Sequence, residues 1–159
     1  MTFKTIAAAF ALTVLGASTL AAAQDRKVGD ILHSDARYTT FAKAIDAAGL
    51  DNVLANDEAV TVLAPTDDAF AKLPAGKLDE LLKPENKAEL AALLKRHFVV
   101  GSLDQYDLKR QRELATAGGD KLPVKLVAGS IRIADARVFG RQSIAVNGTV
   151  QPPDTVLTH

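Results

Sequence analysis

The stretch TVLAPTDDAF, residues 61–70, decides how the rest of the sequence is interpreted. Its first half is apolar enough for a short buried β-strand, and Pro65 ends the strand because proline cannot donate a ladder hydrogen bond. Thr66, Asp67 and Asp68 follow at positions where side-chain oxygens cap a helix and complement its dipole. Adjacent carboxylates can also form an acid/base pair or a metal site. Consecutive helical side chains diverge by about 100°, however, so capping is the interpretation that we favour.

The first 23 residues have the layout of a secretory signal peptide. A single lysine precedes an apolar run, and three alanines favour cleavage after Ala23. The apolar run is shorter than a typical membrane-spanning helix. The alternative to a cleaved signal peptide is an uncleaved N-terminal anchor. We therefore predict a secreted or periplasmic protein with an N-terminal lead-in over residues 24–37 and a single domain over residues 38–159.

Composition excludes several classes of protein. The sequence has no cysteine, so disulfides and thiolate chemistry are absent, and for a secreted domain this favours a bacterial envelope protein. With 19 basic and 19 acidic residues and few aromatic ones, nothing indicates nucleic-acid binding. No second apolar span follows the leader, and we expect no transmembrane anchor in the mature chain.

The first half of the mature sequence has mainly helical patterns. Residues 41–53 carry apolar side chains at near-helical spacing, and Gly49 is placed to end the first helix. Residues 73–98 predict two further helices, which Pro84 separates. In the second of these helices, His97 falls on the same apolar stripe as several leucines.

From Leu114 onward the apolar period changes to two, which is typical of strands. Residues 128–130, AGS, separate two alternating runs and predict a hairpin. Residues 146–150, VNGTV, predict a second hairpin, because Asn-Gly tolerates the positive φ angles of a tight turn. Helices followed by strands predict an α+β fold with a largely antiparallel sheet.

No catalytic constellation is apparent. The histidines His33, His97 and His159 are far apart, so a transition-metal site would need ligands scattered along the chain, and the spacing of a calcium loop is absent. We interpret His97 as a hydrogen-bonded core histidine rather than a catalytic base. Residues 147–149 formally match a glycosylation acceptor but are better interpreted as a tight turn. We predict no catalytic residue, no metal ligand and no cofactor.

These segments together resemble a fasciclin domain. TVLAPTDDAF is similar to the family's Thr-Val-Phe-Ala-Pro-Thr-Asn-x-Ala-Phe, and residues 146–157, VNGTVQPPDTVL, are similar to Asn-Gly-Val-Ile-x-x-Ile-Asp-x-Val-Leu. Between them, residues 93–101, LLKRHFVVG, lie where the family has Leu-Leu-x-Tyr-His-Val-x-x-Gly. The resemblance covers about residues 38–157. It implies a structural role for eight signature residues: Pro65, Thr66, Asp67, Asp68, Phe70, Asn147, Gly148 and Asp154.

The resemblance implies a β-wedge or sandwich of mostly antiparallel strands with helices packed against it. It also implies an extracytoplasmic protein used for adhesion or protein contact. The Tyr-His pair implicated in integrin contact in animal relatives is Arg96-His97 here, so integrin binding is not supported. We expect Arg96, His97 and Val99 to form the contact surface for an envelope or extracellular protein or glycan.

Three functions follow, from different classes. The leading hypothesis is an exported, non-enzymatic adhesion or protein–protein interaction module of the fasciclin type. The alternative is a binding protein that holds a small apolar ligand, a lipid or a polysaccharide fragment between the helices and the sheet. The third is an acid-dependent hydrolase that uses Asp67 or Asp68 together with His97.

Overall fold

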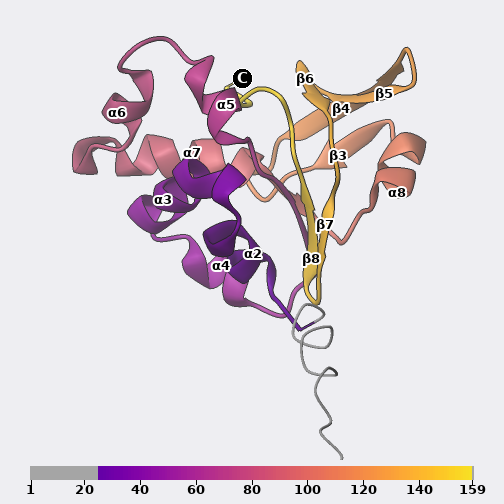
Figure 1. The fold of residues 1–159 in the computed structure, drawn as a ribbon, viewed down its shortest axis with the longest axis horizontal. Coiled ribbons are helices and arrows are strands. Elements are labelled where there is room, and N and C mark those ends of the chain that lie inside the picture. Colours follow the sequence, from indigo (N-terminus) through magenta and orange to yellow (C-terminus); the bar gives the residue numbers. More distant parts are fainter. Residues whose placement is uncertain (1–24, 159) are drawn as a thin grey trace, which may run out of the picture.

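The computed structural model describes residues 25–158, so the predicted signal peptide over residues 1–23 lies outside the described part. Most helices gather in one half of the molecule and the strands in the other, as Figure 1 shows. The predicted α+β fold is confirmed. The helical segments are α2 (Val28–Ser34), η1 (Ala36–Tyr38), α3 (Thr39–Ala48), α4 (Asp51–Ala55), α5 (Asp67–Ala71), α6 (Lys77–Leu81), η2 (Pro84–Asn86), α7 (Lys87–Arg96) and α8 (Gln105–Arg110). The strands are β1 (Val60–Leu63), β2 (Phe98–Val100), β3 (Glu113–Ala115), β4 (Lys121–Val127), β5 (Ser130–Ile133), β6 (Ala136–Val138), β7 (Ser143–Ala145) and β8 (Gly148–Gln151).

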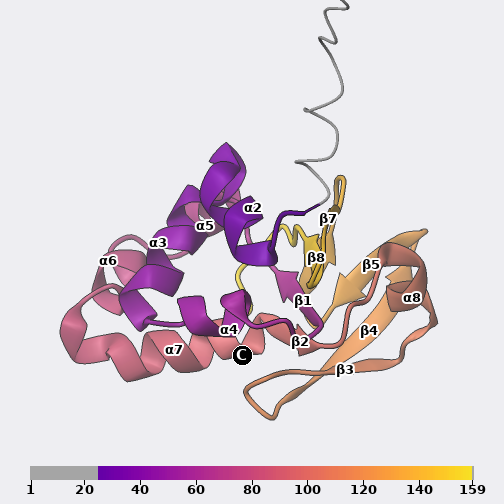
Figure 2. The same cartoon turned by 90° about the horizontal axis from the view of Figure 1, so that it is seen from below.

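The first sheet has the strand order β2-β1-β8-β7 and lies between the helical half and the second sheet (Figures 1 and 2). Its central pair, β1 and β8, is parallel, with Val60 opposite Gly148, and its other pairs are antiparallel. All four residues of β1 are buried because the strand is covered on both faces. Val62 belongs to the core against the helices, whereas Leu63 belongs to the core between the two sheets. This alternation follows from the two-residue period of a strand.

The second sheet has the order β3-β4-β5-β6 and is antiparallel throughout. The structure contains the hairpin predicted around residues 128–130: β4 pairs with β5 through a turn at Ala128 and Gly129. Both turn residues have positive φ angles, 50° and 78°, which is the conformation of a tight type I′ hairpin turn. Leu122, Ile131 and Ile133 point from this sheet into the core that it shares with the first sheet.

The helices pack on the other face of the first sheet. Phe41 and Ile45 of α3 are fully buried, and α3 lies against α7. Gly49 ends α3 in the left-handed conformation, at φ 70°, as predicted. Val53 lies in the separate helix α4 rather than in a continuation of α3. The break predicted at Pro84 is present, where a 3-10 turn separates α6 from α7.

The lead-in of residues 24–37 is part of the folded core, at least from α2 onward. Val28 and Leu32 of α2 are fully buried among the residues of the helical core. Helix α2 packs on α3, α4 and β7, so it joins the helices to the first sheet. Within residues 25–158, no helix is both long enough and apolar enough to cross a membrane.

Candidate functional site

The segment that joins β1 to α5 is a structural joint. Thr66 occupies the N-cap position of α5 with an extended backbone, but its side chain makes no capping hydrogen bond, so that part of the capping prediction is wrong. The Thr66 carbonyl accepts the first helical hydrogen bonds, from the amides of Ala69 and Phe70. The Phe70 side chain holds α5 against α3: its ring centroid lies 6.4 Å from that of Phe41 on α3.

Asp67 caps a different helix from the one that it begins. Its carboxylate accepts a hydrogen bond from the Thr39 hydroxyl and another, 2.8 Å long, from the Thr40 amide at the start of α3. Partial burial disfavours ionisation of Asp67, but the hydrogen bonds from these threonines outweigh it and lower the pKa of the carboxyl group. Asp67 therefore ties α5 to α3, which is a structural role.

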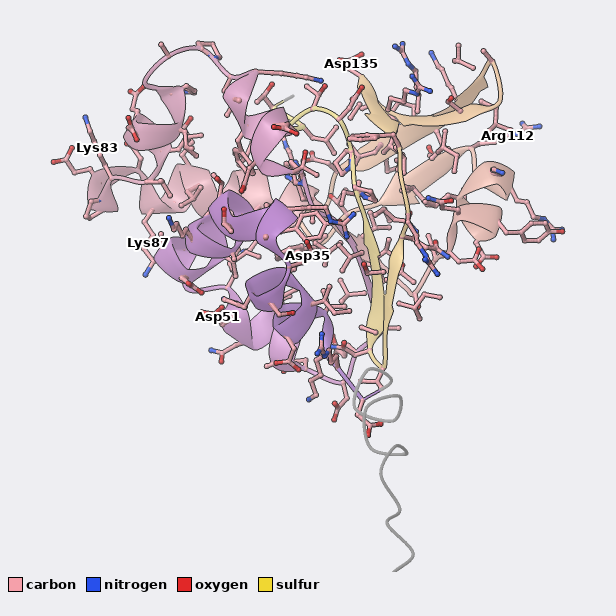
Figure 3. The ribbon with its side chains drawn as sticks, in the orientation of Figure 1. Asp35, Asp51, Lys83, Lys87, Arg112 and Asp135 are labelled. Carbon is pink, nitrogen blue, oxygen red and sulfur yellow. The ribbon has the colours of Figure 1, made fainter. Side chains whose placement is uncertain are left out.

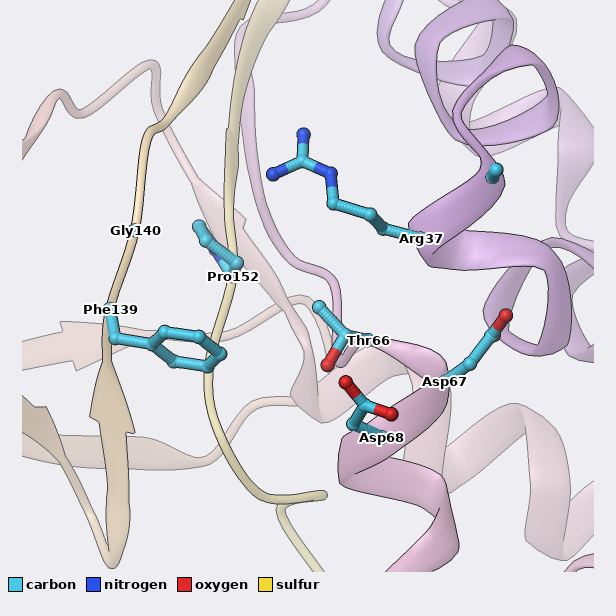
Figure 4. A pocket seen from close by; sticks show the side chains of 8 residues that line it. Arg37, Thr66, Asp67, Asp68, Phe139, Gly140 and Pro152 are labelled. Atoms are coloured by element: carbon cyan, nitrogen blue, oxygen red, sulfur yellow. The ribbon is translucent and has the colours of Figure 1, made fainter.

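Asp68 points elsewhere and lines an open hollow of about 390 Å³ between the helices and the strands. Figure 4 shows the Asp67 carboxylate directed away from this hollow, whereas the Asp68 carboxylate faces the side of Phe139 and Pro152. The guanidinium of Arg37, at the rim, is paired with Asp35 at 2.6 Å. The two adjacent carboxylates thus diverge and do not form an acid pair.

Asn147 joins three segments that are distant in sequence. Its side-chain oxygen accepts from the Val28 amide, and its side-chain nitrogen donates to the carbonyls of Leu54 and Asn56, each at 2.9 Å. Asn147 is only 5% exposed, which leaves no room for a glycan on its side chain. The structural interpretation of residues 147–149 therefore describes this position better than a glycosylation acceptor does.

Gly148 is required for a reason that the sequence did not suggest. The two turn residues of the β7–β8 hairpin are Val146 and Asn147, and Gly148 is already the first residue of β8. A Cβ atom at Gly148 would lie 1.8 Å from the carbonyl oxygen of Val60 on the parallel strand β1. The hairpin predicted at residues 146–150 is present, but Asn-Gly is not its pair of turn residues: the glycine permits close approach of two strands.

Asp154 joins the second sheet to the C-terminal segment. Its carboxylate accepts hydrogen bonds from the Arg137 amide of β6 at 2.8 Å and from the Thr155 hydroxyl at 3.0 Å. Its backbone carbonyl accepts another from the Lys72 ammonium at the end of α5. Like Asp67 and Asn147, this signature residue holds elements together.

His97 is a core residue, as its apolar stripe predicted. It is 1% exposed, and its ring lies 5.9 Å from the Phe41 ring between centroids. Its Nδ1 is 2.9 Å from the Leu93 carbonyl oxygen and its Nε2 is 3.1 Å from the Leu157 amide nitrogen. Because the carbonyl only accepts and the amide only donates, Nδ1 carries the proton and Nε2 is the acceptor. Burial, with a further contribution from the neighbouring Arg96 charge, lowers the pKa of His97 to about 4.

In this arrangement His97 is placed neither to act as a catalytic base nor to form part of a contact surface. Both ring nitrogens are engaged, and the side chain has no access to a substrate or a partner in this conformation. Val99 is also 1% exposed because it belongs to the core between the sheets. The expected contact surface of Arg96, His97 and Val99 is therefore corrected: of these three, Arg96 alone reaches solvent.

Arg96 lies at the end of α7, beside the loop between β3 and β4. Its Nε donates to the Asp120 carboxylate at 2.8 Å, and the two side chains are 34% and 48% exposed. Here they border an open groove of about 730 Å³ along α7. The floor consists mainly of small and apolar side chains: Leu81, Ala88, Ala91, Ala92 and Leu93. Charged residues form the rim: Lys77, Glu89, Lys95, Arg96 and Asp120.

Sequence reasoning found one end of this groove and missed the rest. Lys95 and Arg96 were visible as part of a family motif, but the opposite wall comes from Gly118 and Asp120, which are distant in sequence. Alanines at positions 88, 91 and 92 recur at helical spacing, a pattern that also occurs on any small-residue helix face. Their significance depends on what packs beside them, and local periodicity does not show this.

The fold and these joints define a class of protein whose sequence motifs are structural. Residues 36–159 match the family model described as the fasciclin domain, and the chain therefore belongs to the fasciclin domain family. It is 36% identical over 120 residues to Protein sll1483 of Synechocystis, a match that covers 76% of this chain and 66% of that protein. It is 35% identical over 130 residues to the transforming growth factor-beta-induced protein ig-h3 of Sus scrofa, covering 82% of this chain and 19% of the relative.

A solved structure shows the same fold. The FAS1 domain pair of the insect cell adhesion molecule fasciclin I superposes with a TM-score of 0.74 at 19% sequence identity. The match covers 84% of this chain and 51% of that one. The family resemblance and the fold predicted from the sequence are both confirmed.

Proposed function

We propose that this protein is exported and acts as a non-enzymatic adhesion or protein–protein interaction module, and that its partner binds the groove along α7. Export rests on the signal-peptide pattern of the first 23 residues. The adhesion role is supported by membership of the fasciclin domain family and by the fold shared with a cell adhesion molecule. A non-enzymatic role is supported by His97 and Asp67, whose polar atoms are engaged in structural hydrogen bonds.

The groove itself carries the proposal. Ala88, Ala92 and Lys95 are exposed on α7, and small side chains allow the backbone of a partner to approach the helix closely. The surrounding charges give the groove the anatomy of a protein interface, with an apolar centre and a polar rim. Lys95 makes no ion pair within residues 25–158, so it is available to a carboxylate of the partner. We expect the partner to present an apolar segment flanked by acidic residues.

The test combines capture of the partner with a substitution that fills the groove. The protein is cross-linked in its native envelope, the captured protein is identified, and its affinity for purified variants is measured. Ala92→Arg should abolish or strongly weaken binding, and Arg96→Ala should weaken it. Ala71→Arg, at an exposed position of α5 outside the groove, is the matched control and should bind normally. Unchanged binding by Ala92→Arg would remove the groove from the proposal.

The same groove also supports the ligand-binding alternative. Its volume of about 730 Å³ is within the range of small-molecule sites, roughly 300–1,000 Å³, and much of its floor is apolar. Native mass spectrometry of the protein purified from its own envelope distinguishes the two functions. A lipid or glycan adduct that Ala92→Arg removes would support the ligand binder, whereas an adduct-free mass together with a captured protein would support the adhesion module.

A further inference from the structure

Three side chains that can bind a metal ion converge on the helical half of the molecule; none of them lines the groove along α7 or is a signature residue. They are His33 on α2, Asp46 on α3 and Asp51 at the start of α4. Figure 3 labels Asp51 on this helical side of the molecule, away from the two sheets. This cluster could not be predicted from the sequence, because its members are separated along the chain and meet only when the three helices pack together.

The imidazole of His33 is oriented from outside the cluster. Its Nδ1 lies 2.8 Å from the carbonyl oxygen of Gly29, one helical turn earlier, and must donate its proton there. Its Nε2 then faces the carboxylate of Asp46, at 3.0 Å. Metal-binding histidines commonly donate their second ring N–H to a carbonyl or carboxylate, because this fixes the ring and the tautomer. His33 already has this arrangement, with Nε2 directed at the two acids.

The two carboxylates of the cluster carry more negative charge than His33 alone can balance. His33 is the ion-pair partner of Asp46, and Asp51 has no ion pair among residues 25–158. A carboxyl oxygen of Asp51 lies within 4.8 Å of one of Asp46, so two acids of like charge share one side of the cluster. A divalent cation between them would replace this repulsion with attraction to both acids.

We propose that His33, Asp46 and Asp51 bind a zinc-type divalent ion, through Nε2 and one oxygen of each carboxylate. The ion replaces the proton that Nε2 donates to Asp46 in the metal-free chain, and this proton is released to solvent. The three ligand atoms lie within 4.8 Å of one another. Bonds of about 2.0–2.2 Å require ligand atoms no more than roughly 4 Å apart, so a small rotation of exposed side chains is sufficient. An imidazole with two carboxylates suits zinc and its neighbours better than calcium or magnesium, which prefer oxygen ligands alone. Three protein ligands leave one position for water or a ligand from another molecule.

Zinc bound here would link α2 to α3 and α4. Helix α2 already packs on α3 and α4, and the His33–Asp46 pair joins the exposed edges of α2 and α3 at this point. Binding to the folded chain alone raises its thermal stability by mass action. The inference thus predicts two separate observables, a binding stoichiometry of about one ion per chain and a rise in Tm that depends on the same three residues.

The experiment uses the purified protein, freed of any affinity tag, treated with EDTA and then dialysed. Titration with zinc chloride is followed by calorimetry, and Tm is measured with and without zinc. His33→Gln and Asp46→Asn should each weaken zinc binding by about tenfold or more and remove the zinc-dependent rise in Tm. Asp51→Asn should have the same direction of effect.

The matched controls are His159→Gln, for loss of a histidine, and Asp79→Asn, for loss of an exposed helical aspartate. Both should bind zinc like the original chain. Circular dichroism at the titration temperature verifies that each variant is folded, so loss of the His33–Asp46 ion pair is not mistaken for loss of binding. Zinc binding that survives in folded His33→Gln, or that is absent from the original chain, overturns the proposal.

Discussion

The buried, neutral imidazole of His97 makes the stability of this domain depend on pH in a defined direction. In the folded chain its pKa is about 4, lowered chiefly by burial from the ordinary value of 6.5. Between these two values the unfolded chain binds a proton that the folded chain does not. The contribution of His97 to the free energy of unfolding therefore stays constant above about pH 7 and falls as the pH is lowered through 6.5 towards 4.

The size of the effect follows from the two pKa values. At about 1.4 kcal/mol for each pH unit of difference, His97 alone should cost about 1.4 kcal/mol of stability at pH 5.5 and about 2.5 kcal/mol at pH 4.5, relative to pH 7.5. A domain of this size is typically stable by only about 5–15 kcal/mol, so the loss is readily measured. Urea denaturation followed by circular dichroism, repeated at these pH values, provides the free energies.

The control is His97→Gln, whose amide can donate to Leu93 and accept from Leu157 but does not titrate. All other ionisable groups remain, so the difference in pH dependence between the two chains belongs to His97. The variant is expected to be less stable at pH 7.5 and to lose less stability on acidification. If both chains lose stability in parallel between pH 7.5 and 4.5, the assignment of a neutral, buried His97 is refuted.

Three further substitutions, and Asp68→Ala as the control for one of them, test the joints by urea denaturation at neutral pH. Gly148→Ala should cost at least about 1–3 kcal/mol, because its Cβ would collide with the Val60 carbonyl and force β1 and β8 apart; unchanged stability would show that the strands separate without cost. Asn147→Ala leaves one buried amide and two carbonyls without their partner, and should cost about 3 kcal/mol or more; a loss below about 1 kcal/mol would mean that water replaces the side chain. Asp67→Ala should cost about 0.5–2 kcal/mol through the lost cap of α3, whereas Asp68→Ala should stay within about 0.5 kcal/mol. Equal effects of the two aspartate changes would contradict the assignment.

Much of the fold could be predicted because its determinants are local. Pro65 ends a strand, Gly49 ends a helix and Pro84 separates two helices through backbone constraints that belong to the residues themselves. The apolar stripe that includes His97 likewise predicted burial, since a helix must cover that face.

The features that the sequence did not predict depend on contacts between distant segments. Asp67 lies in the first turn of α5, as predicted, but its hydrogen bonds to α3 could not be foreseen. Gly148 follows an asparagine as turn glycines do, yet its constraint comes from the Val60 backbone on a parallel strand. Parallel pairing joins residues far apart in sequence and leaves no local pattern. The opposite wall of the groove along α7 could not be predicted for the same reason, because Gly118 and Asp120 are distant from α7 in sequence.

The roles of the signature residues also indicate where function lies. Asp67, Asn147 and Asp154 each satisfy backbone groups of another segment, so replacing them would disturb the packing between layers before it changed any contact with a partner. Their polar atoms are used internally, which leaves recognition to exposed positions outside these joints. Arg96, Ala88 and Ala92 are such positions: they lie on the helix that packs on the core but do not belong to the core itself. Partner specificity in this protein is therefore expected to follow substitutions along the groove, while the joints determine only whether the groove exists.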